Sequence, residues 1–318
     1  MMKIFGPIPS RRLGRSLGIN NIPPKVCSYS CVYCQIGSTD SMSITRKEFF
    51  TTDEIFNAVA EKVSQLQKAG EKIDYLTFVP DGEPTLDINL GKTIERLRSF
   101  GIKIAVITNA SLLWAKEVQN DLMNADWVSV KIDSAYENIW KMINRPYGSL
   151  ILQNIIRGIK EFASSFNGIL VTETMLVKDF NAYLKTLNKT AQLISEINPH
   201  KAYILVPTRP PAEKSVSAPS EENLNMAYQI FSGLLNSVEL IAYNEGTDFS
   251  FSSAAEKELL SILAVHPMRK DAVDNFLSRS NSTWDFIDNL IKEKQLKEVI
   301  YSDNTFLIKK HYEVSYGY

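Results

Sequence analysis

Residues 27–34 read CSYSCVYC, and their cysteines, Cys27, Cys31 and Cys34, are the only three in this chain of 318 residues. The spacing C-x3-C-x2-C gathers three thiolates in one short loop and supplies no fourth. Such a set suits a four-iron cluster in which one iron stays open to a small-molecule ligand. Two alternatives remain: a zinc site, which normally has a fourth ligand close by, and three free thiols. The nearest histidine in sequence is His200, far from the loop.

The composition is typical of a soluble enzyme with a sizeable core, because 44% of the residues are hydrophobic, 22% are charged and the formal net charge is -1. No run of about eighteen apolar residues occurs, and the first residues, MMKIFGPIPSRRLG, lack the apolar segment of a signal peptide. Thiolate ligands also need a reducing compartment. The sequence therefore predicts a cytoplasmic protein that does not associate with membranes.

Short β-branched runs alternate with amphipathic helical stretches through most of the chain. We expect strands at residues 16–22, 73–79, 102–107, 127–132, 169–177 and 202–206. The helices between them include one that starts at a Thr-x-x-Glu capping box at 51–54 and one at 112–124. This alternation predicts an α/β fold of parallel strands with crossover helices, in about six units rather than the eight of a closed barrel. Ligands then bind at the C-terminal ends of the strands.

The sequence PDGEPT at residues 80–85 directly follows one expected strand. Gly82 permits a close approach of the backbone, and Pro84 fixes the turn. Glu83 offers a carboxylate to a cationic group. The alternative is an Asp-Gly turn with a solvated glutamate.

Two further strand ends carry polar groups that suit ligand contacts. Thr108 and Asn109 follow the strand at 102–107, where a hydroxyl and an amide can reach a ribose or a carboxylate. We expect Ser111 to cap the next helix. Arg209 stands in Thr-Arg-Pro-Pro after the last core strand, and the prolines make this segment stiff enough to orient a bidentate contact to a carboxylate or phosphate. Its alternative role is that of a solvated surface arginine.

A lysine and an aspartate lie on one side of the strand at 127–132 and its end. Ser129, Lys131 and Asp133 alternate with apolar residues, so they share a face. If that face is the barrel interior, the two charges are costly unless they pair or bind something polar. We therefore take Lys131 and Asp133 as candidate catalytic residues, with an internal ion pair as the competing interpretation. In the next strand Glu173 takes the face opposite to its two threonine neighbours.

The cysteine loop resembles the signature of the radical SAM superfamily, in which an aromatic residue, here Tyr33, precedes the third cysteine. This resemblance implies an open, six-stranded partial barrel, a [4Fe-4S] cluster on the three cysteines and S-adenosylmethionine (SAM) on the open iron. It also implies cleavage of SAM to a 5'-deoxyadenosyl radical, with an electron from a donor such as flavodoxin or ferredoxin. PDGEPT is similar to the GGEP motif that binds the amino group of SAM, with Asp81 in place of the first glycine. The strand end at Thr108 and Asn109 often contributes to SAM contact in this family.

Within the superfamily, several motifs resemble the branch related to tRNA wyosine synthases. They are GPIPSRRLGRSLG at residues 6–18, the cysteine loop, GEPT at 82–85, NRP at 144–146 and TRPP at 208–211. Wyosine synthases carry a second iron-sulfur cluster on additional cysteines, and this chain has none left for one. Pyruvate-dependent ring formation on tRNA is therefore not expected.

The pattern changes near residue 247, and we expect a core domain over residues 1–247 and a small domain over 255–312. Helices at 255–265, 269–277 and 282–294, followed by a hairpin of 296–301 and 305–309, suggest a winged helix. Such modules usually bind DNA, but residues 255–318 hold nine Lys/Arg and ten Asp/Glu. The candidate recognition helix presents Asp285 and Asp288, which a phosphate backbone would repel. A protein or peptide partner, or docking on the protein's own barrel, fits better.

Two functions of different classes follow. The first is a radical SAM enzyme, and the second is a non-catalytic iron-sulfur regulator that uses the winged helix to bind nucleic acid or protein. Residues 1–50 carry seven basic and two acidic residues, which favours tRNA or another anion as substrate, whereas the acidic C-terminal region favours a peptide or protein. We expect His200, His266 and His311 to be surface or packing residues.

Overall fold

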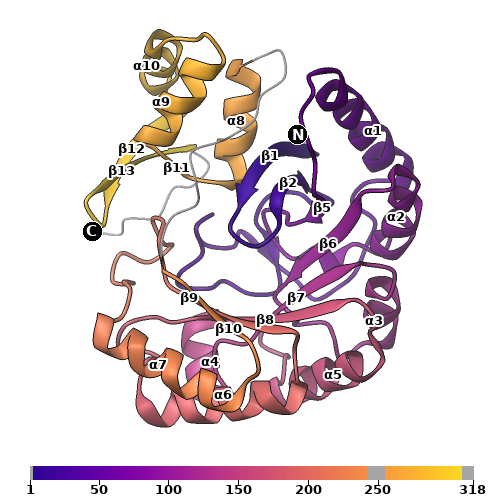
Figure 1. Cartoon of the computed structure of the whole chain (residues 1–318), viewed down its shortest axis with the longest axis vertical. Coiled ribbons are helices and arrows are strands. Elements are labelled where there is room, and N and C mark those ends of the chain that lie inside the picture. Colours follow the sequence, from indigo (N-terminus) through magenta and orange to yellow (C-terminus); the bar gives the residue numbers. More distant parts are fainter. Residues whose placement is uncertain (1–2, 243–254, 310–318) are drawn as a thin grey trace.

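A computed structural model describes residues 3–242 and 255–309 of the chain. Its described part contains a curved sheet of eight strands, with helices on the outer side (Figure 1). Seven strands run parallel to their neighbours, and the first pairs antiparallel with the second at one edge. In spatial order the strands are β1 (Ile4–Ser10), β2 (Gly14–Ile19), β5 (Tyr75–Phe78), β6 (Lys103–Thr108), β7 (Trp127–Lys131), β8 (Ile169–Met175), β9 (Lys201–Leu205) and β10 (Val238–Ile241).

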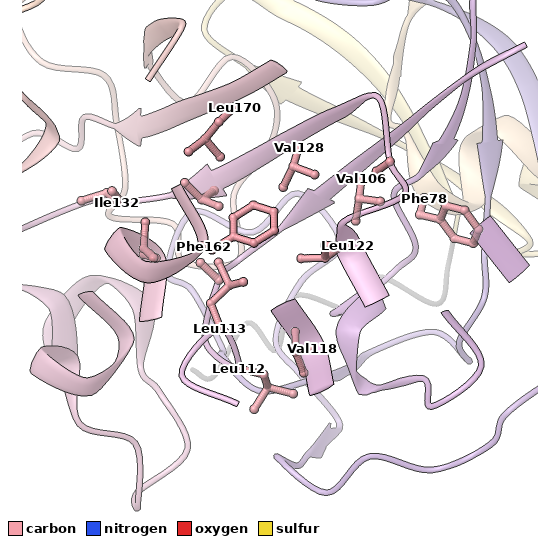
Figure 2. Packing of buried hydrophobic residues seen from close by; sticks show 14 of the residues in the cluster. Phe78, Val106, Leu112, Leu113, Val118, Leu122, Val128, Ile132, Phe162 and Leu170 are labelled. Atoms are coloured by element: carbon pink, nitrogen blue, oxygen red, sulfur yellow. The ribbon is translucent and has the colours of Figure 1, made fainter. Parts of the chain in front are cut away.

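The helices bury one apolar face each against the outer side of this sheet. Figure 2 shows Val106, Val128 and Leu170, from three neighbouring strands, packed against Phe162 of a covering helix. The capping box is confirmed: Thr51 accepts from Glu54 N, and the Glu54 side chain accepts from Thr51 N. The helices are α1 (Thr52–Lys68), α2 (Leu90–Leu97), α3 (Lys116–Leu122), α4 (Glu137–Asn144), α5 (Leu152–Ser165), α6 (Leu184–Ile197) and α7 (Glu221–Leu234).

The predicted α/β fold, a partial barrel of parallel strands, is confirmed, with two strands more than the expected six. Both additions lie at the edges, because β1 precedes the first expected strand and β10 follows the last. The helix expected at 112–124 is shorter, since α3 begins only at Lys116. Two-residue strands, β3 (Val26–Cys27) and β4 (Ser41–Met42), flank the cysteine loop, and a short 3₁₀ helix spans Pro84–Leu86.

The alternation of side chains along the strands decides which residues enter the barrel. Lys131 pairs in register with Glu173, and both lie on the inner face. The turn between β1 and β2 enters the same interior, where Leu13 packs against inward-facing residues such as Trp127 and Tyr203. The N-terminal hairpin therefore fills the open side of the barrel with its own turn.

The C-terminal elements have their own hydrophobic core and rest against the barrel beside β1 (Figure 1). They are α8 (Ala255–Val265), β11 (Met268–Arg269), α9 (Lys270–Arg279), α10 (Trp284–Lys292), β12 (Leu296–Tyr301) and β13 (Asn304–Lys309). The predicted three helices and hairpin are thus present, whereas a winged-helix domain over 255–312 stays a prediction. Its junction with the core, at 243–254, and residues 310–312 lie outside the described residues.

Polar and apolar contacts join the described C-terminal elements to the barrel. Lys62 of α1 forms an ion pair with Glu258, and Arg279 lies 3.7 Å from Glu71. The Tyr301 hydroxyl donates to the Pro207 carbonyl at 3.1 Å. Ile8 of β1 packs against the C-terminal core. In the described ranges, the structure contains no helix that is long and apolar enough to cross a membrane.

Candidate active site

A cavity of about 310 Å³ opens at the C-terminal ends of the strands, next to the cysteine loop. It brings together most of the residues singled out in the sequence. Those that line it are Cys27, Cys31, Cys34, Tyr33, Gly82, Glu83, Thr108, Asn109, Lys131 and Arg209. Pro84 lies behind the wall, where it begins the 3₁₀ helix, and Asp133 lines a small separate cavity.

Backbone hydrogen bonds fix the cysteine loop to its neighbours. Ser30 N donates to the Asn144 carbonyl at 3.1 Å, and Val32 N donates to Ile143 at 2.9 Å. Glu83 N donates to the carbonyl of Val26, directly before Cys27, at 3.1 Å. The loop is therefore held on one side by the end of α4 and on the other by the loop after β5.

The three sulfur atoms lie in surroundings that suit metal-bound thiolates. Burial raises the pKa of the Cys31 thiol to about 12, and it also raises the pKa of Cys27 and Cys34. Thiols with a raised pKa ionise when they bind metal, because coordination displaces the proton. Amide groups then support the sulfur: Asn109 Nδ2 lies 3.5 Å from Cys27 Sγ, and Asn144 Nδ2 lies 3.4 Å from Cys31 Sγ.

This donor set fits a cluster held by three cysteines. Within the described ranges, no group of three or more His, Cys, Asp or Glu side chains lies close enough together to hold a single metal ion. A cluster does not require this, since its thiolates bind separate iron atoms. The chemistry of the set, three thiolates facing a cavity with N–H donors behind them, therefore fits a [4Fe-4S] group with an open iron.

Glu83 joins the loop after β5 to the end of β6 and the loop after it through its two carboxylate oxygens. Oε1 accepts from Thr85 N at 3.0 Å, from Thr85 Oγ1 at 2.6 Å and from Thr108 Oγ1 at 2.6 Å, while Oε2 accepts from Asn109 N at 2.7 Å. Burial raises the pKa of Glu83, and these hydrogen bonds oppose the rise. Gly82 is required here by space, because a Cβ at this position would lie 1.9 Å from the Val26 carbonyl oxygen.

Asn109 continues this network to the cysteine loop. Its Nδ2 donates to Ser28 Oγ at 2.9 Å, and Ser28 Oγ lies 2.6 Å from Ser111 Oγ. The expected capping role of Ser111 is wrong, because α3 begins five residues later, at Lys116, and has Ala115 at its N-cap. Ser111 N instead donates to Asn109 Oδ1 at 2.9 Å. The side chains after β6 thus connect the loop after β5 to the cysteines.

Tyr33, Asp133 and Asn144 form a buried cluster on the other side of the cysteine loop. The Tyr33 hydroxyl donates to Asp133 Oδ2, and Asn144 Nδ2 donates to the same oxygen at 2.7 Å. Asp133 Oδ1 accepts from Met175 N at 2.8 Å. Burial, followed by the charge of Asp133, raises the pKa of Tyr33 well above its usual value. Asp133 therefore faces Tyr33 and the backbone.

The inward face of β7 and β8 carries a second charged cluster. Arg12 Nη1 lies 2.8 Å from Glu173 Oε1, Lys131 Nζ lies 3.5 Å from Glu173 Oε2, and Ser129 Oγ donates to Oε1 at 2.8 Å. Burial raises the pKa of Glu173, but the charges of Arg12 and Lys131 outweigh burial and hold it below its usual value. Arg209 lies in the cavity wall and donates to Gln35 Oε1.

Several cavity or neighbouring residues were not assigned a role from the sequence. Asn144 contacts Cys31, Tyr33 and Asp133, and its only signal was its place in the Asn-Arg-Pro motif. The sequence indicated no role for Arg12 other than membership of a basic segment, because its partner Glu173 lies 161 residues away on β8. His266, expected at the surface or in packing, is buried and lines the cavity from the C-terminal elements.

Comparisons with known proteins agree with this site. A family model described as the radical SAM superfamily matches residues 21–191. The chain is 46% identical to the UPF0026 protein MJ1312 of Methanocaldococcus jannaschii over 96% of this chain and 95% of that protein. A radical SAM methyltransferase from Sphaerobacter thermophilus has a similar fold, with a TM-score of 0.56 at 13% identity over 71% of this chain and 66% of that one.

A structure of TYW1 with a lysine-pyruvate adduct aligns with 93% of this chain and 80% of its own, with a TM-score of 0.47 and 12% identity. The match to the radical SAM superfamily model covers more than half of this chain, and the cysteine loop at residues 27–34 lies in the matched segment. The chain therefore belongs to the radical SAM superfamily, whose members use a [4Fe-4S] cluster and S-adenosylmethionine.

Proposed function

We propose that this protein is an enzyme that reductively cleaves SAM at a [4Fe-4S] cluster on Cys27, Cys31 and Cys34 and uses the product to modify a substrate. One observation carries the proposal: the three cysteines line a single cavity whose lining also includes Gly82 and Glu83. The cluster, when bound, supplies the electron that cleaves the sulfonium of SAM to a 5'-deoxyadenosyl radical.

In this proposal the side chains around the cavity orient the two cofactors and exclude water. Asn109 and Asn144 donate to the cluster thiolates, and Glu83 fixes the loops that meet SAM. Pro84 keeps the turn after Glu83, and Thr108 fixes the Glu83 carboxylate.

Tyr33 belongs to the cysteine loop, and the ammonium group of Lys131 lies 5.3 Å from the centroid of its ring. Asp133 holds the Tyr33 hydroxyl in place. Lys131 and Arg209 lie in the cavity wall, where they attract the anionic part of a ligand, and Asp133 acts on the reaction through Tyr33.

The substrate that we propose is a tRNA base or a peptide or protein. Arg11, Arg12, Lys131 and Arg209 in the cavity lining favour an anionic substrate such as RNA. Residues 255–312 would form a winged-helix-like domain that rests on the barrel, and His266 would bring this domain to the cavity. Flavodoxin or ferredoxin would supply electrons, and the cytoplasm would supply the reducing compartment that thiolate ligands need.

The test is anaerobic reconstitution with iron and sulfide, reduction with dithionite, and assay for 5'-deoxyadenosine. The proposal expects this product from SAM, with a cluster confirmed by its absorption and electron paramagnetic resonance spectra. A protein that holds an intact cluster and yields no 5'-deoxyadenosine would refute the proposed function. Circular dichroism of Cys31→Ala separates loss of the cluster from loss of the fold.

A further inference from the structure

Arg12 is a buried arginine with a hydrogen-bond donor that the protein does not use. It stands in the turn between β1 and β2, and its side chain is 15% exposed. Its Nη1 meets Glu173, whereas its Nε is buried and has no hydrogen-bond partner among the described residues. An unpartnered buried donor on a charged group is costly, so we expect a ligand to supply the missing acceptor.

Arg12 and Lys131 share one carboxylate. Arg12 Nη1 lies 2.8 Å from Glu173 Oε1, and Lys131 Nζ lies 3.5 Å from Glu173 Oε2. In the described ranges the cavity lining includes both cations, and Arg11 as well, but not Glu173. A ligand in the cavity therefore meets the positive members of this cluster. Buried cations that outnumber their partners are unfavourable, and a bound anion balances them.

The backbone of Arg12 lies at the end of the barrel opposite to the cysteines. β2 starts at Gly14, directly after the turn, and the cysteine loop follows its other end at Ile19. The six residues of β2 span about 20 Å. Because Arg12 and the three cysteines line the same cavity, this cavity extends from the cysteine loop toward the turn. In the proposed function SAM occupies the cysteine end, which leaves the end at Arg12 for the substrate.

The C-terminal elements add a further polar group to the cavity. α8 packs beside β1, the strand that leads into the turn, and Ile8 of β1 contacts the C-terminal core (Figure 1). His266 directly follows α8, is buried and lines the cavity together with Arg11 and Arg12. An imidazole can donate a hydrogen bond in either protonation state. The turn and the C-terminal elements thus bring two arginines and a histidine to one cavity.

We propose that Arg12 binds a phosphate group of the substrate, and this inference rests on the proposed function. A guanidinium N–H forms strong, charge-assisted hydrogen bonds with the oxygens of phosphate or carboxylate groups. A nucleotide of an RNA carries its phosphate into the cavity with it, whereas a peptide brings a carboxylate only at an acidic residue or at its C-terminus. Of the substrate classes proposed above, Arg12 therefore selects RNA.

The experiment uses the cluster-loaded full chain saturated with S-adenosylhomocysteine, so that the SAM part of the cavity is filled. Anaerobic calorimetry measures the affinity for uridine 5'-monophosphate, for uridine, which lacks the phosphate, and for glutarate, which carries carboxylates instead. Arg12→Lys keeps a charge beside Glu173 but lacks the guanidinium, and Arg12→Gln removes the charge. Arg15→Gln is the matched control, because Arg15 lies in the same hairpin, pairs with Glu71 and is outside the cavity lining in the described ranges.

We expect uridine 5'-monophosphate to bind at least tenfold more tightly than uridine or glutarate. Arg12→Lys and Arg12→Gln should each weaken its binding by about tenfold or more, as for loss of a hydrogen bond to a charged group. Their affinity for S-adenosylhomocysteine should be unchanged, and Arg15→Gln should behave as the unmodified protein. If Arg12→Gln fails to load its cluster, Arg12→Lys decides.

The inference would be overturned if the unmodified protein showed no preference for uridine 5'-monophosphate, or if Arg12→Lys bound it as tightly as the unmodified protein does. Preferred binding of glutarate would indicate a peptide and would also overturn it. A loss of S-adenosylhomocysteine affinity in Arg12→Lys would assign Arg12 to SAM or to the fold instead. If the unmodified protein binds uridine 5'-monophosphate but not S-adenosylhomocysteine, the proposed function fails while the phosphate site stands.

Discussion

Replacing Asp81 with asparagine should make the protein more stable, by an amount that grows with pH. Burial raises the pKa of Asp81 to about 7, compared with a usual value of 3.8. Near pH 3 and below, the folded and unfolded states both hold most of this proton, so the destabilisation by Asp81 is small. As the pH rises to 7 the unfolded state loses the proton and the folded state retains it, so the native state becomes less favoured.

The magnitude follows from the size of the pKa difference. A pKa that is about three higher in the folded state than in the unfolded state destabilises the folded protein by about 4 kcal/mol. This full destabilisation is reached above pH 7. Asparagine has no such titration. Part of the destabilisation by Asp81 is already present at pH 5. The free energy of unfolding of Asp81→Asn, relative to that of the unmodified protein, should therefore increase by roughly 3 kcal/mol from pH 5 to pH 8.

Anaerobic urea unfolding of the cluster-loaded protein without SAM, at pH 5, 6, 7 and 8, measures this difference. Asp40→Asn serves as the control and should show no comparable trend, because its carboxylate is exposed. A stability difference that does not change with pH would refute the reasoning, and so would an unmodified protein that is more stable than Asp81→Asn at pH 8.

Three more outcomes follow from the geometry. Asn144→Ala removes an N–H donor to a cluster thiolate, so potentiometry should give a more negative cluster potential; an unchanged potential would contradict this. Gly82→Ala forces a Cβ against the Val26 carbonyl, and iron analysis should show reduced cluster loading, which full loading would rule out. Arg12→Gln leaves Glu173 with one cation, and we expect a loss of about 3 kcal/mol in urea unfolding, partly recovered when Glu173→Gln is added. No recovery in the double variant would argue against this pairing.

The central strands and the loops that form the site were predictable, because both depend on patterns of neighbouring residues in the sequence. Apolar runs with turn residues located the central strands, and polar groups after them necessarily meet at one edge of a parallel sheet. The edge strand β1 was missed since Pro7 and Pro9 argue against a strand. The strand at the other edge, β10, was missed as well. Arg12 and Asn144 were missed because their roles depend on contacts between distant segments, which no local pattern contains.

The backbone hydrogen bonds on both sides of the cysteine loop bear on how the protein responds to oxygen. Val26, Ser30 and Val32 bond to the loop after β5 and to the end of α4 through main-chain groups alone, without help from iron. A ligand loop tethered in this way should retain its shape when its inorganic core is oxidised and lost. We therefore expect the damaged centre to be rebuilt in place, without refolding of the chain around it.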